Sequence, residues 1–414
     1  MSLKSTSLAE ESKRVQRQFC LVQLFYGFAW ASMTYFILLL QSTGMSPQEV
    51  GLIMSLNSFA ALIAPPLWGM LADKRGSRKR LFIWLLLASG ITFALIPASA
   101  LINVFGVNLV AIFLPAVTFI RQPTVSIIDT IIVNTTEHFG GIDYSTIRRW
   151  SSLGFAIMSP VYSWLIPKTG IELPYYLFLV FCLCTIFFMR TLPDYSKPVE
   201  KQDEPHREKL RLSRIFKNYY LVVFLIFNIL LSFGGQIYYF ISYLLESVQE
   251  DPQLVGLFSG LKTIVEILML SLAPKLKRYL SLPQMLCLSG LFYAVEPLLY
   301  PLCSNAVQIC LVQLLSGAGF GTLLASAVNY AYSLAPKGLE TTVTSLYGIG
   351  MGVAGIIANA FAGWAIETLG IDWMYWITGL TIGASVVLFI LSFTFGRVVL
   401  KKKAPLPFSL KKSV

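Results

Sequence analysis

Charged side chains are scarce in this chain of 414 residues. Asp, Glu, Lys and Arg make up 13% of the sequence, whereas 56% is hydrophobic; soluble globular proteins carry about 25% charged residues. A single folded core cannot bury so much apolar surface, so lipid must be the solvent for much of it. The scarcity of charge therefore excludes an ordinary soluble protein and predicts an integral membrane protein.

Histidine is almost absent, and cysteine is rare. The two histidines, His138 and His206, fall in predicted loops, and the six cysteines lie in or beside apolar runs. Cys182 and Cys184 are too close together for a metal-binding pair. No nucleotide-binding loop and no cleavable signal pattern are present. We therefore expect no metal and no cofactor, and the sequence argues against an enzyme.

Apolar runs long enough to cross a bilayer as helices, which takes about 20 residues, occur twelve times. They cover 19–40, 50–72, 81–102, 107–133, 146–167, 173–190, 219–245, 254–274, 282–303, 306–335, 341–366 and 373–396. The polar stretches are predicted as an N-terminal cytoplasmic tail at 1–18, a cytoplasmic linker at 191–218 and a basic cytoplasmic tail at 397–414. The predicted fold class is an all-α membrane protein with twelve transmembrane helices in two six-helix bundles, at 19–190 and 219–396.

Basic residues lie almost entirely on one side of these spans. The N-terminus, the loops after even-numbered spans and the C-terminus carry 29 of the 32 Lys and Arg residues, whereas the other side carries only Lys168. The positive-inside rule then places both termini in the cytoplasm, and we expect the cytoplasmic membrane of a bacterium. This clustering also explains the net charge of +11, so we expect the lipid bilayer as a partner and no nucleic acid.

The chain contains an internal repeat. The hexapeptide that starts at Pro47 (PQEVGL) recurs 205 residues later, starting at Pro252 (PQLVGL). A second echo has an offset of 200 and matches Trp164, Ile166, Gly170, Ile171 and Tyr175 with Trp364, Ile366, Gly370, Ile371 and Tyr375. Two parallel repeats predict pseudo-symmetric bundles with a binding site at their interface near the middle of the membrane.

The segment after the second span carries a motif. It reads GMLADKRGSRKR and contains Gly69, Asp73, Arg75, Gly76 and Arg78. It resembles the signature of the major facilitator superfamily between the second and third helices. The resemblance implies a transporter that works by alternating access. It also implies that the Asp and the basic residues lock neighbouring helix ends, and that the glycines allow close helix approach and a tight turn.

A second resemblance involves the fourth and fifth spans. Pro123 and Asp129, followed by the stretch YSTIRRWSSLGF with Arg148, are similar to proton symporters for sugars and nucleosides of the lactose-permease kind. This implies that Asp129 and Arg148 serve substrate binding. Because the first, fourth, seventh and tenth helices line the cavity in this fold, it also favours Arg121 facing the cavity. Phe155 stands where lactose permease has a sugar-stacking Trp, so galactoside specificity is not expected.

Five charged residues stand out inside predicted spans, where each costs at least about 2.5–3.5 kcal/mol and normally faces a cavity or a partner. They are Arg121, Asp129, Lys262, Glu266 and Glu296. Lys262 and Glu266 are one helical turn apart on one face, so we expect Glu266 to be the proton site, with Asp129 and Glu296 as rivals. The alternatives are a self-neutralising pair at Lys262 and Glu266, a gate bridge at Asp129, and a hydrogen bond to kinked backbone at Glu296.

The remaining site prediction concerns the substrate. We expect Arg121 and Arg148 to orient it, because their guanidinium groups form bidentate hydrogen bonds. Polar and aromatic groups complete the pocket; they are Tyr26, Trp30, Gln236, Tyr239, Asn329 and Asn359. The function implied is proton-coupled or sodium-coupled symport of a small sugar, nucleoside or related solute by a monomer. The alternative is an exporter or a lipid or glycolipid flippase of the same fold.

The first testable prediction concerns the motif. Asp73→Asn removes a charge-assisted interaction of about 1.5–3 kcal/mol, which is roughly a tenfold or larger shift between two conformations. Transport should therefore fall strongly, while expression and thermal stability remain near wild type. Unchanged transport by a normally expressed variant would show that the motif does not control the conformational balance.

Overall fold

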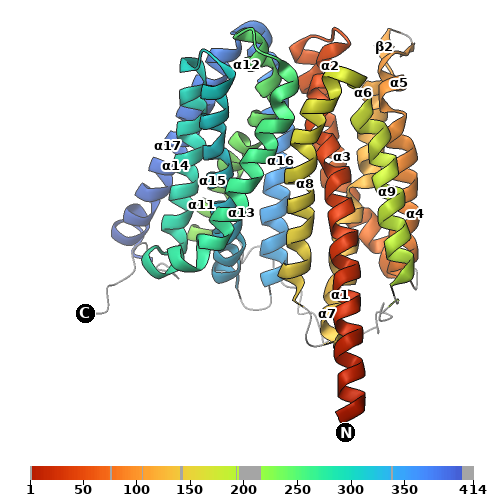
Figure 1. Cartoon of the computed structure of the whole chain (residues 1–414). Coiled ribbons are helices and arrows are strands. Elements are labelled where there is room, and N and C mark those ends of the chain that lie inside the picture. Colours follow the sequence, from red (N-terminus) through yellow and green to blue (C-terminus); the bar gives the residue numbers. More distant parts are fainter. Residues whose placement is uncertain are drawn as a thin grey trace. The chain divides into compact units, whose positions relative to one another are not determined.

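The computed structural model describes residues 2–74, 77–104, 106–139, 143–192, 194, 216–336 and 339–402, and most of these residues are helical (Figure 1). In the first part of the chain the elements are α1 (Ser2–Trp30), η1 (Ala31–Tyr35), α2 (Phe36–Ser42), α3 (Pro47–Lys74), α4 (Arg78–Ala94), α5 (Ile96–Ala100), β1 (Asn103–Val104), β2 (Val107–Asn108), α6 (Val110–Arg121), α7 (Pro123–Phe139), α8 (Tyr144–Thr169) and α9 (Leu173–Thr191). In the second part they are α11 (Tyr219–Ile237), η2 (Tyr238–Phe240), α12 (Ile241–Ser247), η3 (Pro252–Leu254), α13 (Val255–Tyr279), α14 (Leu282–Leu299), η4 (Tyr300–Leu302), α15 (Ala306–Leu334), α16 (Glu340–Thr368) and α17 (Ile371–Val398).

All twelve predicted spans coincide with helical segments. Within the described ranges, ten segments are long and apolar enough to cross a membrane. The other two are α4 with α5, where the helix is interrupted at Leu95, and α8, whose first turns carry Arg148 and Arg149. Both are helical over most of the predicted span.

The ends of some predicted segments differ from the structure. The stretch predicted as an N-terminal tail is the start of α1, because its Glu, Lys, Arg and Gln residues are good helix formers. The fourth span begins at Val110 rather than at 107, because the preceding residues form a β-hairpin in which Asn103 pairs with Asn108. Gly106, with φ of 81°, provides the turn. Positions 193 and 195–215 of the predicted linker and 403–414 of the C-terminal tail lie outside the described residues.

The internal repeat is visible in the helices. The segments that begin at Pro47 and Pro252 end at Lys74 and Tyr279, so both pairs of ends are 205 residues apart. The first span of each repeat contains a 3₁₀ interruption, η1 or η2. Gly170 and Gly370, which the second echo aligns, both have positive φ, at 102° and 93°. The two repeats therefore share local backbone conformations as well as sequence.

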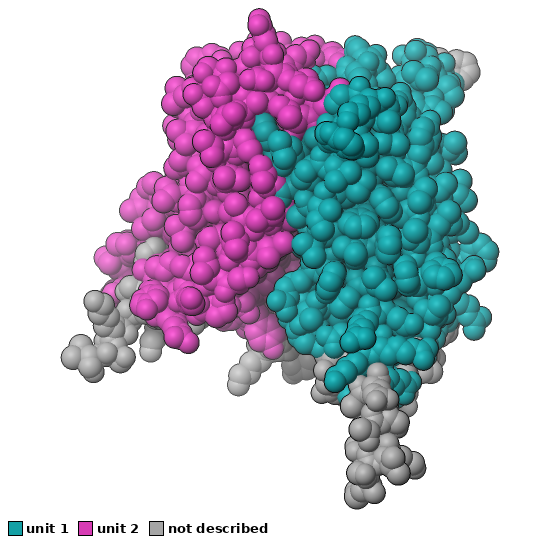
Figure 2. Space-filling view, in the orientation of Figure 1, with its two compact units in different colours: residues 1–44, 59–205, 255–260 teal, residues 45–58, 206–254, 261–414 magenta. Residues whose placement is uncertain are grey.

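The chain divides into two compact units (Figure 2). Unit 1 comprises residues 1–44, 59–205 and 255–260, and unit 2 comprises residues 45–58, 206–254 and 261–414. These units differ from the two predicted bundles because the starts of α3 and α13 pack on helices of the other repeat.

The start of α3 belongs to unit 2, and the start of α13 belongs to unit 1. In unit 2 the start of α3 packs on α16: Ser55 Oγ donates to the Ile356 carbonyl over 2.8 Å. In unit 1 the start of α13 packs on α8, and the Leu257 amide donates to Ser163 Oγ over 2.8 Å. Helices of different repeats therefore meet at two equivalent places.

Glycine makes the α13–α8 contact possible, which gives the second prediction. A Cβ at Gly256 would overlap the Tyr35 hydroxyl and the Ser159 carbonyl. Gly256→Val should therefore destabilise the protein by about 1–3 kcal/mol through overpacking, measured as a lower melting temperature in detergent. The control is Gly348→Ala in α16, where a Cβ meets no atom within 4 Å. Equal melting temperatures for Gly256→Val and wild type would contradict the close contact.

Candidate functional site

A polar cluster in unit 1 is built around an interrupted helix. Arg121 is the last residue of α6, and α7 begins at Pro123, which has no N–H and cannot continue the hydrogen-bond ladder. The Thr124 hydroxyl donates to the Arg121 carbonyl over 2.7 Å. Because that hydrogen is used, the Tyr26 hydroxyl, 2.7 Å from Thr124 Oγ1, acts as the donor between them. The interruption thus links α1 to Arg121.

The Arg121 guanidinium is buried and lies over an aromatic ring. Its central carbon is 4.6 Å from the centre of the Trp30 ring, and Nη2 donates to Gln122 Oε1 over 3.3 Å. Only 4% of Arg121 is exposed. A desolvated cation over Trp contributes about 2 kcal/mol or more, which offsets part of the cost of burying it. Arg121, Tyr26 and Trp30, all predicted substrate residues, therefore form one cluster.

Gln23 is a further polar residue on the part of α1 that carries Tyr26 and Trp30. It is buried, and both atoms of its amide lack a hydrogen-bond partner within the described part of the chain. Gln23, Tyr26 and Trp30 are spaced by three and four residues, so they share one face of α1. This spacing of three and four residues is the feature of the sequence that indicates a shared helix face. A buried amide with unused donors and acceptors is suited to binding a polar ligand.

Asp129 and Arg148 lie together at the predicted cytoplasmic end of unit 1. Arg148 Nε is 3.6 Å from Asp129 Oδ1, and about a third of each side chain is exposed. Exposed pairs of this kind contribute about 0–1 kcal/mol. The pair is therefore too weak to be needed for folding, which leaves both residues available for a substrate or a gate.

A charged cluster in unit 2 surrounds Lys262 on α13. Its Nζ lies 3.2 Å from the centre of the Tyr238 ring, and the Phe320 ring is 5.9 Å away. Lys262 is buried and interacts electrostatically with Glu296 and with Glu266. Helical spacing predicted Glu266 as its partner, and the structure adds Glu296 of α14 as a second carboxylate that acts on the same charge. Tyr238 was missed because it lies in η2, where a regular helical pattern does not apply.

Glu296 on α14 is more deeply buried than Glu266. It is 2% exposed, whereas Glu266 is partly exposed. The Tyr300 hydroxyl donates to Glu296 Oε1 over 2.8 Å. Pro297 follows directly, and the helix changes to the 3₁₀ segment η4 at Tyr300. One alternative from the sequence was a hydrogen bond between Glu296 and the kinked backbone. The hydrogen bond in the structure instead joins Glu296 to the side chain of Tyr300.

The other predicted substrate residues are spread over unit 2. Gln236 lies close to Gly355 of α16, and the Tyr239 ring is 4.1 Å from that of Tyr238. Asn359 Nδ2 donates to Ser58 Oγ over 3.0 Å, so it joins α16 to α3. Asn329 is exposed, and its amide donates to the Ala325 carbonyl of its own helix. The described contacts therefore do not link Asn329 to the other predicted substrate residues.

The motif after α3 is only partly described. Gly69 has open space around it, so no close helix approach occurs at this position. Asp73 lies in the last turn of α3, with its side chain outside the described residues, as are Arg75 and Gly76. Arg78 is the first residue of α4.

The start of α4 is attached to the end of α9. Ser77 Oγ donates to Asp194 Oδ2 over 2.6 Å. Lys79 Nζ donates to the Arg190 carbonyl over 3.1 Å and also to the Leu192 carbonyl. The last residues of the motif are therefore anchored to the chain that follows α9.

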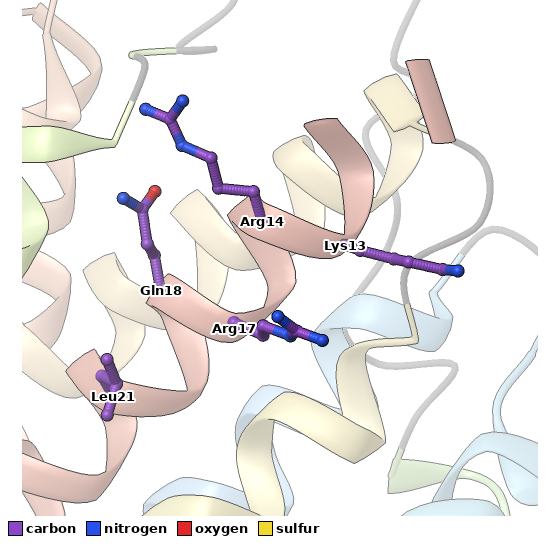
Figure 3. Close-up of a pocket in the computed structure, with 5 residues that line it drawn as sticks. All are labelled: Lys13, Arg14, Arg17, Gln18 and Leu21. Carbon is purple, nitrogen blue, oxygen red and sulfur yellow. The ribbon is translucent and has the colours of Figure 1, made fainter. Parts of the chain in front are cut away.

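A basic surface pocket of about 370 Å³ lies near the start of α1 (Figure 3). It is lined by Lys13, Arg14, Arg17, Gln18 and Leu21, and in Figure 3 Arg14 and Lys13 point away from each other. Arg17 and Trp30 are thirteen residues apart, which is roughly 20 Å along a helix. The pocket is therefore separate from the Arg121 cluster.

Apolar helices that cross a membrane, with buried charged groups inside them, define a polytopic membrane transporter rather than an enzyme. The model of the MFS_1 like family matches residues 20–396. The chain therefore belongs to this family and has the major facilitator fold.

Curated relatives and solved structures agree with this assignment. The chain is 25% identical to a maltose permease of Geobacillus stearothermophilus, over 85% of this chain and 87% of that protein. It is 24% identical to the uncharacterized transporter YwbF of Bacillus subtilis (strain 168), over 85% of each chain. The nucleoside transporter NupG superposes with a TM-score of 0.75 at 21% identity, covering 92% of this chain and 99% of that one. A D-xylose–proton symporter superposes with a TM-score of 0.69 at 13% identity, covering 92% and 97%.

The third prediction concerns the start of α8, which carries Arg148. Asp143 caps this helix by accepting from the Thr146 amide over 2.9 Å. Hydrogen bonds from Ser145 and Thr146 lower the pKa of Asp143 to about 2. Asp143→Ala should therefore lower the stability of the start of α8 by about 1 kcal/mol at neutral pH.

The lowered pKa sets the pH dependence of that cost. A cap with a depressed pKa stabilises the folded state above the ordinary aspartate value of about 3.9. The difference between wild type and Asp143→Ala should therefore shrink as pH falls from about 4 towards about 2. Hydrogen exchange of the first α8 amides measures this difference in local stability. A difference that does not change with pH would show that the ionised Asp143 carboxylate does not cap the helix.

Proposed function

We propose that the protein is a proton-coupled symporter that takes up a small sugar, nucleoside or related polyhydroxylated solute by alternating access. In this proposal both termini face the cytoplasm, and polar groups from each repeat contact the solute during the cycle. Arg121, Trp30, Tyr26 and Gln23 provide the half of the site that belongs to the first repeat. Lys262, Tyr238 and Tyr239 provide groups from the second repeat.

The observation that carries the proposal is the Arg121–Trp30 stack on the face of α1 that also carries Gln23. Guanidinium and amide groups form hydrogen bonds with hydroxyl groups, and an aromatic ring packs on the apolar face of a sugar or on a base. The cluster holds its donors in place through the Pro123 interruption and the Tyr26–Thr124 bond. A rigid set of donors beside an aromatic face suits a ring-shaped solute with several hydroxyl groups.

The relatives support the same substrate class. One curated relative is named a maltose permease, and two of the similar structures are a nucleoside transporter and a D-xylose–proton symporter. Their solutes share a ring that carries several hydroxyl groups. This common chemistry, rather than any single solute, is what we carry over to this chain.

Alternating access requires contacts between the repeats that can break and form again. Gly51 of α3 faces Gly363 of α16 so closely that a Cβ at either position would overlap the other helix. Gly256 and Gly260 of α13 make equally close contacts with α8. Small residues give flat surfaces with few interlocking side chains, so such contacts separate without rearrangement of the helices.

The fourth prediction tests the solute site. Arg121→Lys keeps the charge but loses the planar fork, so binding should weaken by about 1.5–3 kcal/mol, roughly tenfold or more. The measurement is uptake of labelled maltose, xylose and uridine into proteoliposomes, with and without an imposed pH gradient. Arg148→Lys is tested in parallel.

The matched control is Arg190→Lys, at an exposed position in the last turn of α9. It should bind like wild type. If Arg121→Lys also binds like wild type, the Arg121 cluster is structural. If wild type transports none of these solutes in either condition, the proposed substrate class is wrong.

A further inference from the structure

The basic pocket near the start of α1 takes no part in the proposed solute site. Its cations, Lys13, Arg14 and Arg17, lie within little more than one helical turn, and all three are exposed. Glu11 lies one turn before Arg14, but within the described part of the chain none of the three cations forms an ion pair or a hydrogen bond. The pocket therefore presents positive charge that its described neighbours do not neutralise.

The pocket lies along one face of α1. Arg14, Gln18 and Leu21 follow one another at intervals of four and three residues, and Arg17 is one turn from Leu21, so these side chains share a side of the helix. Figure 3 shows Arg14 and Gln18 extending to one side of this face, whereas Lys13 and Arg17 extend to the other. The volume of about 370 Å³ is in the range of small-molecule sites. An anionic group in this pocket would be met by cations from two sides.

The same face of α1 becomes apolar from Leu21 onwards. Leu21 is 38% exposed, and Phe25 and Phe28 follow it at intervals of four and three residues. The Phe25 ring stacks on Phe188 of α9 with centres 5.5 Å apart, and the Phe28 ring lies 5.3 Å from that of Phe181. These four phenylalanines are only partly buried. The basic pocket is therefore followed, along the helix, by partly exposed apolar side chains of α1 and α9.

The change from basic to apolar coincides with the predicted edge of the hydrocarbon core. The first apolar run begins at Phe19, so Arg17 and Arg14 precede it by about 3 and 8 Å along the helix. The headgroup layer occupies about 5–8 Å on each side of a bilayer. The cations therefore lie at the depth of the headgroups, and Leu21 and Phe25 lie at the depth of the acyl chains. The positive-inside rule assigns this end of α1 to the cytoplasmic leaflet.

We propose that this pocket binds the headgroup of an anionic phospholipid of the cytoplasmic leaflet, whose acyl chains lie along the apolar continuation of the same face. Arg14 and Arg17 bind the phosphate through paired N–H groups, and Lys13 adds a point charge. The Gln18 amide donates to a glycerol or ester oxygen. The apolar continuation from Leu21 favours a lipid over free phosphate, which has nothing to place there. This site is separate from the solute site and does not depend on the proposed function.

The fifth prediction concerns lipid binding by the purified full chain in detergent. Native mass spectrometry measures how tightly the first molecule of phosphatidylglycerol binds, compared with phosphatidylethanolamine that carries the same acyl chains. Wild type should prefer the anionic lipid by about tenfold or more, because each basic residue near a headgroup contributes about fivefold. The combined variant Lys13→Gln, Arg14→Gln and Arg17→Gln should lose this preference. A wild type without the preference, or a variant that keeps it, would overturn the proposal.

A matched control separates the pocket from general attraction between basic residues and anionic lipid. Lys275→Gln, Lys277→Gln and Arg278→Gln combined remove three charges from exposed positions at the end of α13, on the same predicted side of the membrane. This variant should prefer phosphatidylglycerol as wild type does. Equal losses in the two triple variants would show diffuse attraction instead of a site. The melting temperature without added lipid should be the same in all three proteins, because every altered side chain is exposed.

Two further arms distinguish a lipid from free phosphate. Inorganic phosphate, added in large excess over the lipid at constant ionic strength, should leave phosphatidylglycerol bound, because it makes no contact with the apolar side chains. Displacement of the lipid would assign the pocket to free phosphate and refute the lipid site. Leu21→Gln keeps every charge but interrupts the apolar face, so it should weaken phosphatidylglycerol binding several-fold. Wild-type affinity in Leu21→Gln would show that the acyl chains do not lie along this face.

Discussion

The cost of a charge inside a hydrocarbon layer governs how this protein is built. Among the described residues, three charged side chains are nearly inaccessible to solvent, and each contacts an aromatic residue. Trp30 lies under Arg121, Tyr238 lies under Lys262, and Tyr300 donates to Glu296. Aromatic rings suit this role because they bring apolar bulk together with an electronegative face or a hydroxyl group. The charged groups are therefore kept in the membrane without a full ion pair for each.

Each of these aromatic–charge contacts coincides with an irregular point in a helix. Arg121 ends α6 before the Pro123 interruption, Tyr238 lies in η2, and Glu296 precedes Pro297 and η4. Interrupted helices in membranes occur where freed backbone groups are satisfied by neighbours or face a cavity. The Thr124–Arg121 bond lies at such an interruption. The same positions thus supply both the polar backbone and the charged side chains of the candidate sites.

The sequence predicts the spans well because a membrane helix needs a long apolar run, and such runs are visible without knowledge of tertiary structure. It also identifies Arg121, Lys262 and Glu296, since a charge within such a run stands out. It does not identify Tyr238, because a Tyr in an apolar run has no distinctive signal. Its importance depends on helix rotation and on the 3₁₀ segments, which tertiary packing decides. For the same reason helical spacing indicates Glu266 as the partner of Lys262 and does not indicate Glu296, which tertiary packing brings to the same lysine.

The 3₁₀ segment η1 separates α1, which ends at Trp30, from α2 within the first span. A 3₁₀ helix advances about 2.0 Å and 120° per residue, and an α-helix about 1.5 Å and 100°. Conversion of these five residues to α-helix would shorten the span by about 2.5 Å and turn α2 by roughly 100° relative to α1. A small change in the hydrogen-bond pattern of η1 would thus rotate α2 about the helix axis and shift it along that axis. Because η2 occupies the corresponding place in the second repeat, the first span of each repeat contains a 3₁₀ segment that could rotate the part of the helix beyond it.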